Sequence, residues 1–198
     1  MNFLNYQWQR VLVFIALSCG MIQQAQAIDT ELWDKFQNGD AVALLRHALA
    51  PGTGDPVEFS LNDCSTQRNL SEQGRLQATQ IGALLKSNGI QQAAVYSSQW
   101  CRCIDTANGL DFGMVEPLPM LNSFYQDRST ESEQTDILTK WILTRLENPD
   151  NNAISAAILV SHQVNITALT GVYPSSGELV LVGYKDSQLV VLGTLRTD

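Results

Sequence analysis

Short runs of consecutive apolar residues, each ending in polar or basic side chains, give this chain its pattern. Residues 42–45 (VALL) run directly into Arg46 and His47, and residues 157–160 (AILV) run into Ser161 and His162. Four apolar residues in succession, without helical spacing, are typical of a strand buried on both faces of a sheet. The two histidines are the only ones in the sequence, and each follows such a strand.

Between the strands, apolar residues return every three or four positions, which indicates amphipathic helices. Helices are predicted over 30–37, 71–86, 131–146 and 163–169, and a further helix after Ser98 contains Arg102. Ser71 is an expected N-cap, because its hydroxyl can accept from the first free backbone N–H groups. The predicted apolar faces are Leu76, Ile81, Leu84 and Leu85 in the first long helix, and Ile137, Leu138, Trp141, Ile142 and Leu146 in the second.

The alternation of strands and helices predicts an α/β fold. Further strands are expected at 93–96 and 114–121, and a hairpin at 179–195 with its turn at 185–187. Right-handed crossovers then give a three-layer α/β/α sandwich with a mainly parallel sheet and an antiparallel hairpin at its edge. Ligands of such sheets bind outside the carboxyl ends of the strands, where the long loop 48–69 lies.

The first 27 residues have the pattern of a signal peptide. Arg10 supplies a positive start, residues 11–22 are apolar, and Ala25-Gln26-Ala27 is a cleavage signal. The apolar run is shorter than the roughly 20 residues that span a membrane, and no later segment is comparable. We therefore expect cleavage after Ala27, one domain over 28–198, and a periplasmic or secreted protein. A lipoprotein site at Cys19 is the less favoured alternative.

The net charge limits the classes of binding partner, and the cysteines indicate which covalent bridges and metal sites to expect. The formal net charge of −8 makes nucleic acid and anionic lipid unexpected partners. After cleavage Cys64, Cys101 and Cys103 remain, and an oxidising compartment favours a bridge from Cys64 to one of the other two. Three buried free thiols are the alternative. No C-x2-C pair is present, so a structural zinc site is not expected.

The basic residues that follow the strands suggest phosphate chemistry. The guanidinium groups of Arg46 and Arg102 match phosphate oxygens, and helix N-terminal N–H groups add to the positive field. An imidazole held between such cations has its pKa lowered, stays neutral and can act as a nucleophile. His47 and His162 therefore predict phosphoryl transfer through a phosphohistidine.

Four segments then resemble the histidine phosphatase (phosphoglycerate mutase-like) superfamily. They are residues 46–48 (RHA), 70–78 (LSEQGRLQA), 96–107 (YSSQWCRCIDTA) and 160–162 (VSH), in the family's order. The resemblance implies that His47 is the nucleophile and that Arg46, Arg102 and His162 hold the phosphoryl oxygens. It also implies a phosphoglycerate mutase-like fold without metal or cofactor, and a small phosphorylated substrate. Some members of this family in bacterial envelopes act on phosphorylated sugars of lipopolysaccharide, and other members act on phosphohistidine proteins.

The sequence departs from this family at two positions. Ala48 replaces the usual glycine, and Ser123 stands where many relatives carry a glutamate that protonates the leaving group. Asp127, Asp55, Asp63 and Glu116 are other candidates for this acid. A missing acid would suit a substrate with a good leaving group, or a slow enzyme.

The alternative function is a non-catalytic phosphate-binding or envelope-interaction protein on the same fold. A mutase would need a second basic cluster for a second phosphate, and the sequence has none. A cysteine phosphatase would need an arginine six residues after a cysteine, and this spacing does not occur either. The sequence predicts neither the substrate nor the oligomeric state.

Overall fold

The protein is built on a six-stranded sheet with strand order β3-β2-β4-β1-β5-β6. The structure, a computed structural model, describes residues 30–149, 154–195 and 197. Strands β3, β2, β4 and β1 are parallel, whereas β5 and β6 form an antiparallel hairpin at the edge. The strands are β1 (Ala41–Arg46), β2 (Ala94–Ser97), β3 (Val115–Pro117), β4 (Ala157–Ser161), β5 (Leu179–Lys185) and β6 (Gln188–Leu195).

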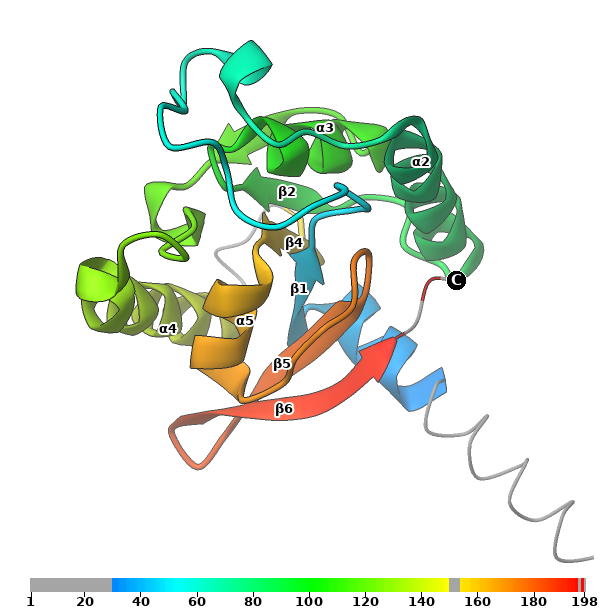
Figure 1. Ribbon diagram of the computed structural model, residues 1–198. Helices are drawn as coiled ribbons and strands as arrows, with labels where there is room; N and C mark the ends of the chain where they lie inside the picture. The colour runs from blue at the N-terminus through cyan, green and yellow to red at the C-terminus, as the bar shows by residue number, and fades with distance from the viewer. Residues whose placement is uncertain (1–29, 150–153, 196, 198) are drawn as a thin grey trace, which may run out of the picture.

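Helices cover both faces of the sheet, as the alternating pattern predicted. They are residues 30–38, α2 (Glu72–Ser87), α3 (Cys101–Gly109), α4 (Glu131–Glu147) and α5 (Gln163–Thr170). Figure 1 shows α2 and α3 on one side of the central strands and α4 and α5 on the other. The three-layer sandwich with its antiparallel C-terminal hairpin is thereby confirmed.

Alternate residues of β1 enter two separate hydrophobic clusters. Leu45 belongs to the cluster that contains Ile81 of α2, and Leu44 to the cluster that contains Ile142 of α4. Both strand residues are completely buried. This two-sided burial explains why the strand is a continuous apolar run rather than an alternating one.

The predicted apolar face of α2 was partly wrong. Leu76 is 58% exposed, and the helix buries Gly74, Ala78 and Gly82 beside Ile81. A Cβ at Gly74 would lie 2.1 Å from a backbone carbonyl oxygen of the loop after β1. The helix therefore packs backbone against backbone at this point, and small residues rather than large ones form its contact.

The predicted face of α4 also needs one correction. Leu138 and Ile142 are buried, as expected, but Ile137 is 46% exposed. These two side chains are the only fully buried ones of the helix, and Trp141 and Leu146 pack partly buried against the same cluster. Among the described residues, no helix is long and apolar enough to cross a membrane.

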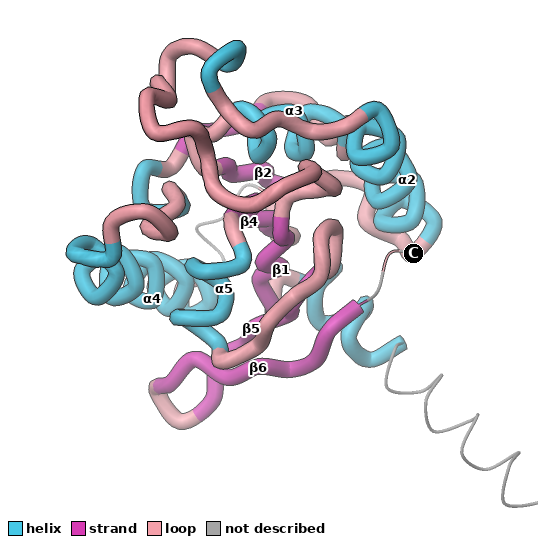
Figure 2. Tube along the Cα trace, viewed as in Figure 1, coloured by secondary structure: helices cyan, strands magenta, loops and turns pink. Residues whose placement is uncertain are grey.

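The carboxyl ends of the parallel strands meet at one edge of the sheet. Figure 2 shows the long loop between β1 and α2 passing over this edge. The loop contains one short 3-10 turn, Cys64–Thr66. Residues 1–27, the expected signal peptide, lie outside the described residues, as does most of the turn predicted at 148–152.

Candidate active site

The two histidines follow neighbouring parallel strands. Strands β1 and β4 pair so that Arg46 lies opposite Ser161, and each histidine comes one residue later. The ring centroids of His47 and His162 are 5.5 Å apart, and the two residues are 2% and 3% exposed. The structure thus brings together two side chains that are more than a hundred residues apart in sequence.

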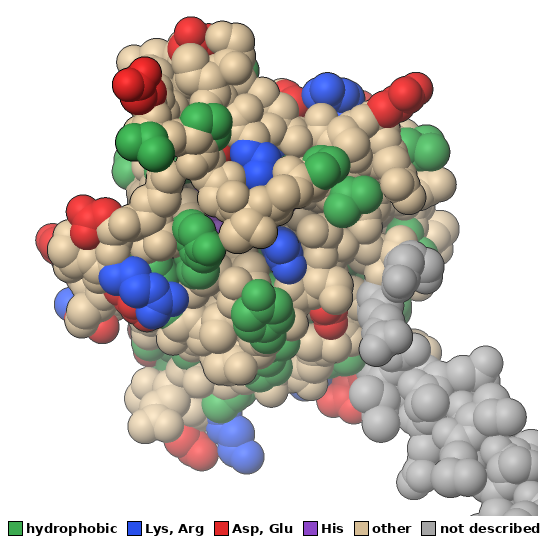
Figure 3. Space-filling model, in the orientation of Figure 1, with side chains coloured by type: hydrophobic (Ala, Val, Ile, Leu, Met, Phe, Trp, Pro, Cys, Tyr) green, Lys and Arg blue, Asp and Glu red, His purple; other side chains and the backbone are tan. Residues whose placement is uncertain are grey.

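A cavity of about 200 Å³ opens at this edge of the sheet. Arg46, His47, Arg102 and His162, which are the predicted site residues, all line it. Figure 3 shows a small area of histidine surface between hydrophobic and basic side chains on this face. The cavity is also lined by Gly52, Asp55, Arg68, Ser123, Tyr125 and Tyr173.

The imidazole of His47 is held in one tautomer. Its Nδ1 lies 2.8 Å from the carbonyl oxygen of Ala48, so Nδ1 carries the proton and donates it. The unprotonated nitrogen is therefore Nε2. The pKa of His47 is lowered to about 3, mainly by burial and also by the charges of Arg102, Arg68 and Arg46, while the bond to Ala48 opposes this shift. The neutral imidazole expected from the basic neighbours is present, but burial is its main cause.

His162 is held in the opposite tautomer. Its Nδ1 accepts from Arg102 Nη2 at 3.3 Å, so its proton lies on Nε2, which donates to Ser98 Oγ at 2.9 Å. Ser98 in turn donates to Asn122 Oδ1 at 3.3 Å. Burial is the main cause that holds the pKa of His162 well below its ordinary range, followed by the charge of Arg102 and by His47.

Three arginines surround the cavity, one more than the sequence indicated. Arg46 donates from Nη1 to the carbonyl oxygen of Pro174 at 2.8 Å. Arg68 donates to the carbonyl oxygens of Gly54 and Ala50 and also lines the cavity. Sequence reasoning missed Arg68, whose only signal was a positive charge two residues before the LSEQG segment.

Two of these guanidinium groups keep an unused donor. The Nε atoms of Arg46 and Arg102 are buried and have no hydrogen-bond partner among the described residues. A buried N–H without a partner costs free energy, about 1–3 kcal/mol. Both arginines line the same cavity, and an unpartnered guanidinium N–H is a donor suited to an anion.

Asp55 is the one proposed acid that reaches the cavity. Its carboxylate pairs with Arg102, and the two side chains are 4% and 3% exposed. Burial raises the pKa of Asp55, but the hydrogen bonds and the charge of Arg102, together with the bonds from Arg68 N–H and Trp100, lower it by more, so Asp55 is ionised and cannot donate a proton at neutral pH. Asp63, Asp127 and Glu116 are exposed on the surface and do not line the cavity.

The RHA and LSEQG segments fit together through backbone contacts. Leu49 N–H donates to Gln77 Oε1 at 2.9 Å, and Gln77 Nε2 donates to the carbonyl oxygen of Ser176 at 2.9 Å. Ser71 caps α2, as predicted, by accepting from Gly74 N–H. These residues hold the chain immediately after His47, which explains the spacing of the segment.

Thr106 of α3 supports the same loop from the other side. Its Oγ1 accepts from Ala48 N–H at 3.0 Å and donates to the carbonyl oxygen of Arg102 at 2.7 Å. Ala48 is completely buried against small neighbours such as Ala78. The methyl group that replaces the usual glycine is therefore accommodated.

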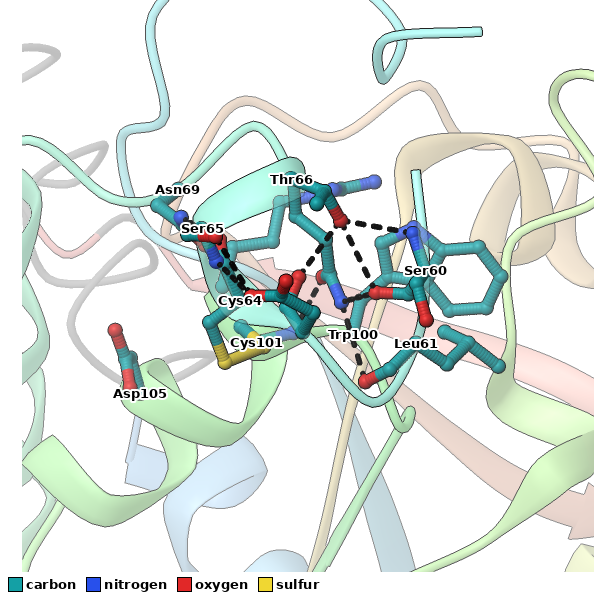
Figure 4. Close-up of a disulfide and its surroundings, with 12 residues drawn as sticks. Ser60, Leu61, Cys64, Ser65, Thr66, Asn69, Trp100, Cys101 and Asp105 are labelled. Carbon is teal, nitrogen blue, oxygen red and sulfur yellow. Dashed lines mark hydrogen bonds between the residues drawn. A yellow bond between two sulfur atoms is a disulfide. The ribbon is translucent and has the colours of Figure 1, made fainter. Parts of the chain in front are cut away.

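A disulfide joins the long loop to the start of α3. Cys64 is bonded to Cys101, which confirms that Cys64 pairs with one of the two later cysteines. Figure 4 shows the bridge beside the turn 64–66 and Trp100, and Cys101 N–H donates to Gln67 Oε1. The bridge thus connects the segments that carry Arg68 and Arg102. Cys103 is a buried free thiol whose pKa burial raises to about 12.

Two loops form the outer wall of the cavity. Gln126 Nε2 donates to the carbonyl oxygen of Asp55 at 3.0 Å, and the ring of Tyr125 lies next to Gly54. Tyr125 and Tyr173 are 51% and 73% exposed at the cavity mouth. Nothing in the hydrophobic pattern distinguished these exposed tyrosines from ordinary surface residues.

The described residues bring together no group of three His, Cys, Asp or Glu side chains that could hold a metal ion. The polar side chains of the cavity are instead dominated by arginine, which binds anions and not metals.

Comparison with known families identifies one match. The family model described as "Histidine phosphatase superfamily (branch 1)" matches residues 42–123. This range contains His47 and Arg102 and ends at Ser123. No curated protein sequence matches the chain.

Solved structures share the fold at low sequence identity. The protein histidine phosphatase SixA complexed with tungstate has a TM-score of 0.55 and 14% identity, and the match covers 79% of this chain and 97% of that chain. A phosphoserine phosphatase from Entamoeba histolytica in complex with phosphoserine has a TM-score of 0.56 and 12% identity, with 80% and 98% covered. A mycobacterial glucosyl-3-phosphoglycerate phosphatase has a TM-score of 0.51 and 16% identity, with 72% and 89% covered.

Proposed function

The chain belongs to the histidine phosphatase superfamily, and we propose that it hydrolyses phosphomonoesters through a phosphohistidine on His47. The observation that carries this proposal is the fixed tautomer of His47, whose Nδ1–H is bonded to a backbone carbonyl and whose Nε2 keeps its lone pair. A neutral, oriented imidazole beside three arginines is what nucleophilic attack on a phosphate requires.

The reaction has two steps. Nε2 of His47 attacks the phosphorus atom, a P–N bond forms, and the P–O bond to the alcohol breaks. The leaving oxygen takes a proton from solvent, because the carboxylate of Asp55 is ionised. Water then attacks the phosphohistidine, and inorganic phosphate and free His47 are released. Arg46 and Arg102 hold the phosphoryl oxygens and stabilise the charge of both transition states, and His162 keeps Arg102 in place.

The rest of the substrate lies against the outer wall in this proposal. Tyr125 and Tyr173 offer ring faces at the mouth, and Gln126 and Gln163 offer amide groups. Apolar ring surfaces with hydrogen-bonding amides suit an uncharged, hydroxylated group. A sugar phosphate of the cell envelope is the substrate that we favour, with other small phosphoesters as alternatives.

The proposal includes export to the periplasm or the medium, on the pattern of residues 1–27. The Cys64–Cys101 disulfide supports it, because disulfides persist in oxidising compartments. The proposed reaction uses no metal and no cofactor.

One observation favours a second candidate, a phosphate-binding protein without turnover. Asp55 is the carboxylic residue that lines the cavity, and its lowered pKa leaves no neutral carboxylic acid to protonate a leaving group there. Such a protein would keep the arginines and histidines and release no phosphate.

Phosphate release from a panel of phosphomonoesters, in the presence of EDTA, tests these alternatives. We expect release by the wild type and its loss in His47→Ala by about 10⁴-fold or more, as removal of a covalent nucleophile commonly costs. Acid-labile phosphate trapped on the wild-type protein would identify the phosphohistidine. If the wild type binds inorganic phosphate and releases none from any ester, the protein is a phosphate-binding protein and the proposal of a phosphatase is wrong.

A further inference from the structure

Arg102 has four of its five N–H donors engaged by the protein. Nη1 donates to Asp55 Oδ1 at 2.7 Å and to the carbonyl oxygen of Arg68 at 3.3 Å. Nη2 donates to Asp55 Oδ2 at 3.1 Å and to His162 Nδ1 at 3.3 Å. The donor that remains is Nε–H, which is buried without a partner in a side chain that is 3% exposed. The terminal fork of this arginine is therefore committed before any phosphate arrives.

Asp55 is held as completely as the arginine that it binds. Besides the two bonds from Arg102, Oδ1 accepts from Arg68 N–H at 3.0 Å and Oδ2 accepts from Trp100 Nε1–H at 3.0 Å. An ionised carboxylate has about four acceptor sites, and here all of them are filled. Gln126 also binds its backbone oxygen. Every one of these partners donates, so the cluster stabilises one charge state and one orientation.

Displacing the carboxylate would cost more than an exchange of anions at a surface. Removal of one partner from a buried ion pair leaves the other charge buried without compensation, and the bonds from Arg68 N–H and Trp100 would be lost as well. A carboxylate that served as a removable block on the arginine would not need these additional donors. The geometry therefore favours a pair that stays intact while phosphate binds.

We propose that Asp55 is a positioning residue, which holds the Nη1–Nη2 end of Arg102 so that Nε–H is directed at the phosphoryl group. The inference rests on the phosphoryl-binding role proposed above for Arg102. Asp55 acts through the arginine and through Trp100, and it does not touch the substrate. Arg46, whose Nε is also buried without a partner, presents a second donor of the same kind.

The opposite role for Asp55 makes the opposite prediction. If the carboxylate were a gate that competes with phosphate for Arg102, its removal would tighten phosphate binding. If Asp55 positions Arg102, its removal weakens binding, because the guanidinium is free to turn. The affinity for inorganic phosphate, measured by calorimetry, therefore distinguishes the two roles by its sign and does not depend on turnover.

The first variant is Asp55→Asn, with Asp63→Asn as the matched control. Asp63 is an exposed aspartate that caps the turn 64–66 by accepting from Ser65, and asparagine is an equally good cap. We expect Asp55→Asn to weaken phosphate binding and kcat/KM by about 10- to 100-fold, the cost of a small misplacement. The control should match the wild type. Unchanged or tighter binding in Asp55→Asn would overturn the inference.

A merely structural role of Asp55 is separated by a double-mutant cycle with Arg102→Lys. Lysine has no fork for Asp55 to hold, so Asp55→Asn should cost little in that background if it acts through the arginine. An equal loss in both backgrounds would show that Asp55 acts on the fold as a whole, and the inference would fail.

The wild type provides a test that does not depend on folded variants. Its Arg102 Nε–H proton, assigned through bonds from the backbone of the same residue, should move in NMR spectra when inorganic phosphate is added. A signal that does not respond to bound phosphate would overturn the inference and leave the proposed phosphatase intact. If the wild type neither binds phosphate nor releases it from esters, both this inference and the proposed phosphatase are wrong.

Discussion

The ends of β1 and β4 each carry a histidine, but different groups hold the two imidazole rings. His47 is fixed by a bond to the adjacent backbone carbonyl of Ala48, which needs no other element of the fold. His162 is fixed by side chains of other segments, through Arg102 on one nitrogen and Ser98 on the other. The free lone pair is on Nε2 in His47, whereas in His162 the lone pair on Nδ1 is already used.

This difference fits the nucleophile that we propose at His47 and a supporting group at His162. A nucleophile needs an unused lone pair and an orientation that does not change when substrate binds, and a local backbone bond supplies both. His162 instead links Arg102 to Ser98 and Asn122, so its position depends on several elements. We therefore expect substitutions of the two histidines to affect different steps of the reaction, and to different extents.

The largest effect beyond that of His47 is expected at His162. Replacing His162 by Ala removes the group that accepts from Arg102, and kcat should fall by about 10²- to 10³-fold, as when one stabilising group of a transition state is removed. His47 should still be phosphorylated slowly, because its own bond to Ala48 is untouched. Single-turnover experiments with labelled substrate measure this step. A variant that forms no phosphohistidine would show that the two histidines act as a single unit.

A smaller effect is expected at Ser98. Ser98→Ala removes the acceptor of His162 Nε2–H and leaves the pocket otherwise intact, so kcat should fall by about tenfold, the usual worth of one buried hydrogen bond. Ser129→Ala is a matched control, because Ser129 is an exposed serine on the surface turn 128–130. Equal activity of both variants would mean that the bond to Ser98 is not needed, and that Arg102 and the Cys103 thiol, 3.5 Å from His162 Nε2, hold the ring.

The strand ends were predictable because a strand buried on both faces consists of consecutive apolar residues. Residues 42–45 and 157–160 identified both strands, and the parallel order predicted that His47 and His162 meet. Leu76 was placed wrongly, because periodicity records which residues are apolar but not how closely two backbones approach. The smallest residues of α2 make its closest contact.

The support of His162 could not be predicted in the same way. Its partners Ser98 and Arg102 lie in a segment that the family resemblance singled out, but the hydrogen bonds depend on the register between β2 and β4. Asp55 was one of several candidate acids in a long loop. Only the fold shows that it pairs with Arg102 and is ionised.

Burial is the property that the two histidines share, and it leads to the smallest predicted effect. The pKa of each is lowered in the folded protein, to about 3 for His47, against 6.5 in an unfolded chain. The unfolded state therefore takes up protons that the folded state does not, and stability falls as the pH is lowered below 7. Between pH 7 and 6 the free energy of unfolding should fall by about 0.7 kcal/mol for each histidine.

Urea unfolding at pH 7 and 6, at constant ionic strength and without phosphate, measures this loss. Gln at either position does not titrate, so His47→Gln and His162→Gln should each remove about half of the pH dependence. Asp55 does not interfere, because its pKa is lowered from 3.8 and it stays ionised over this range. If only one of the two variants changed the slope, the other histidine would be accessible to protons, and the burial that the two strand ends share would not determine their charge.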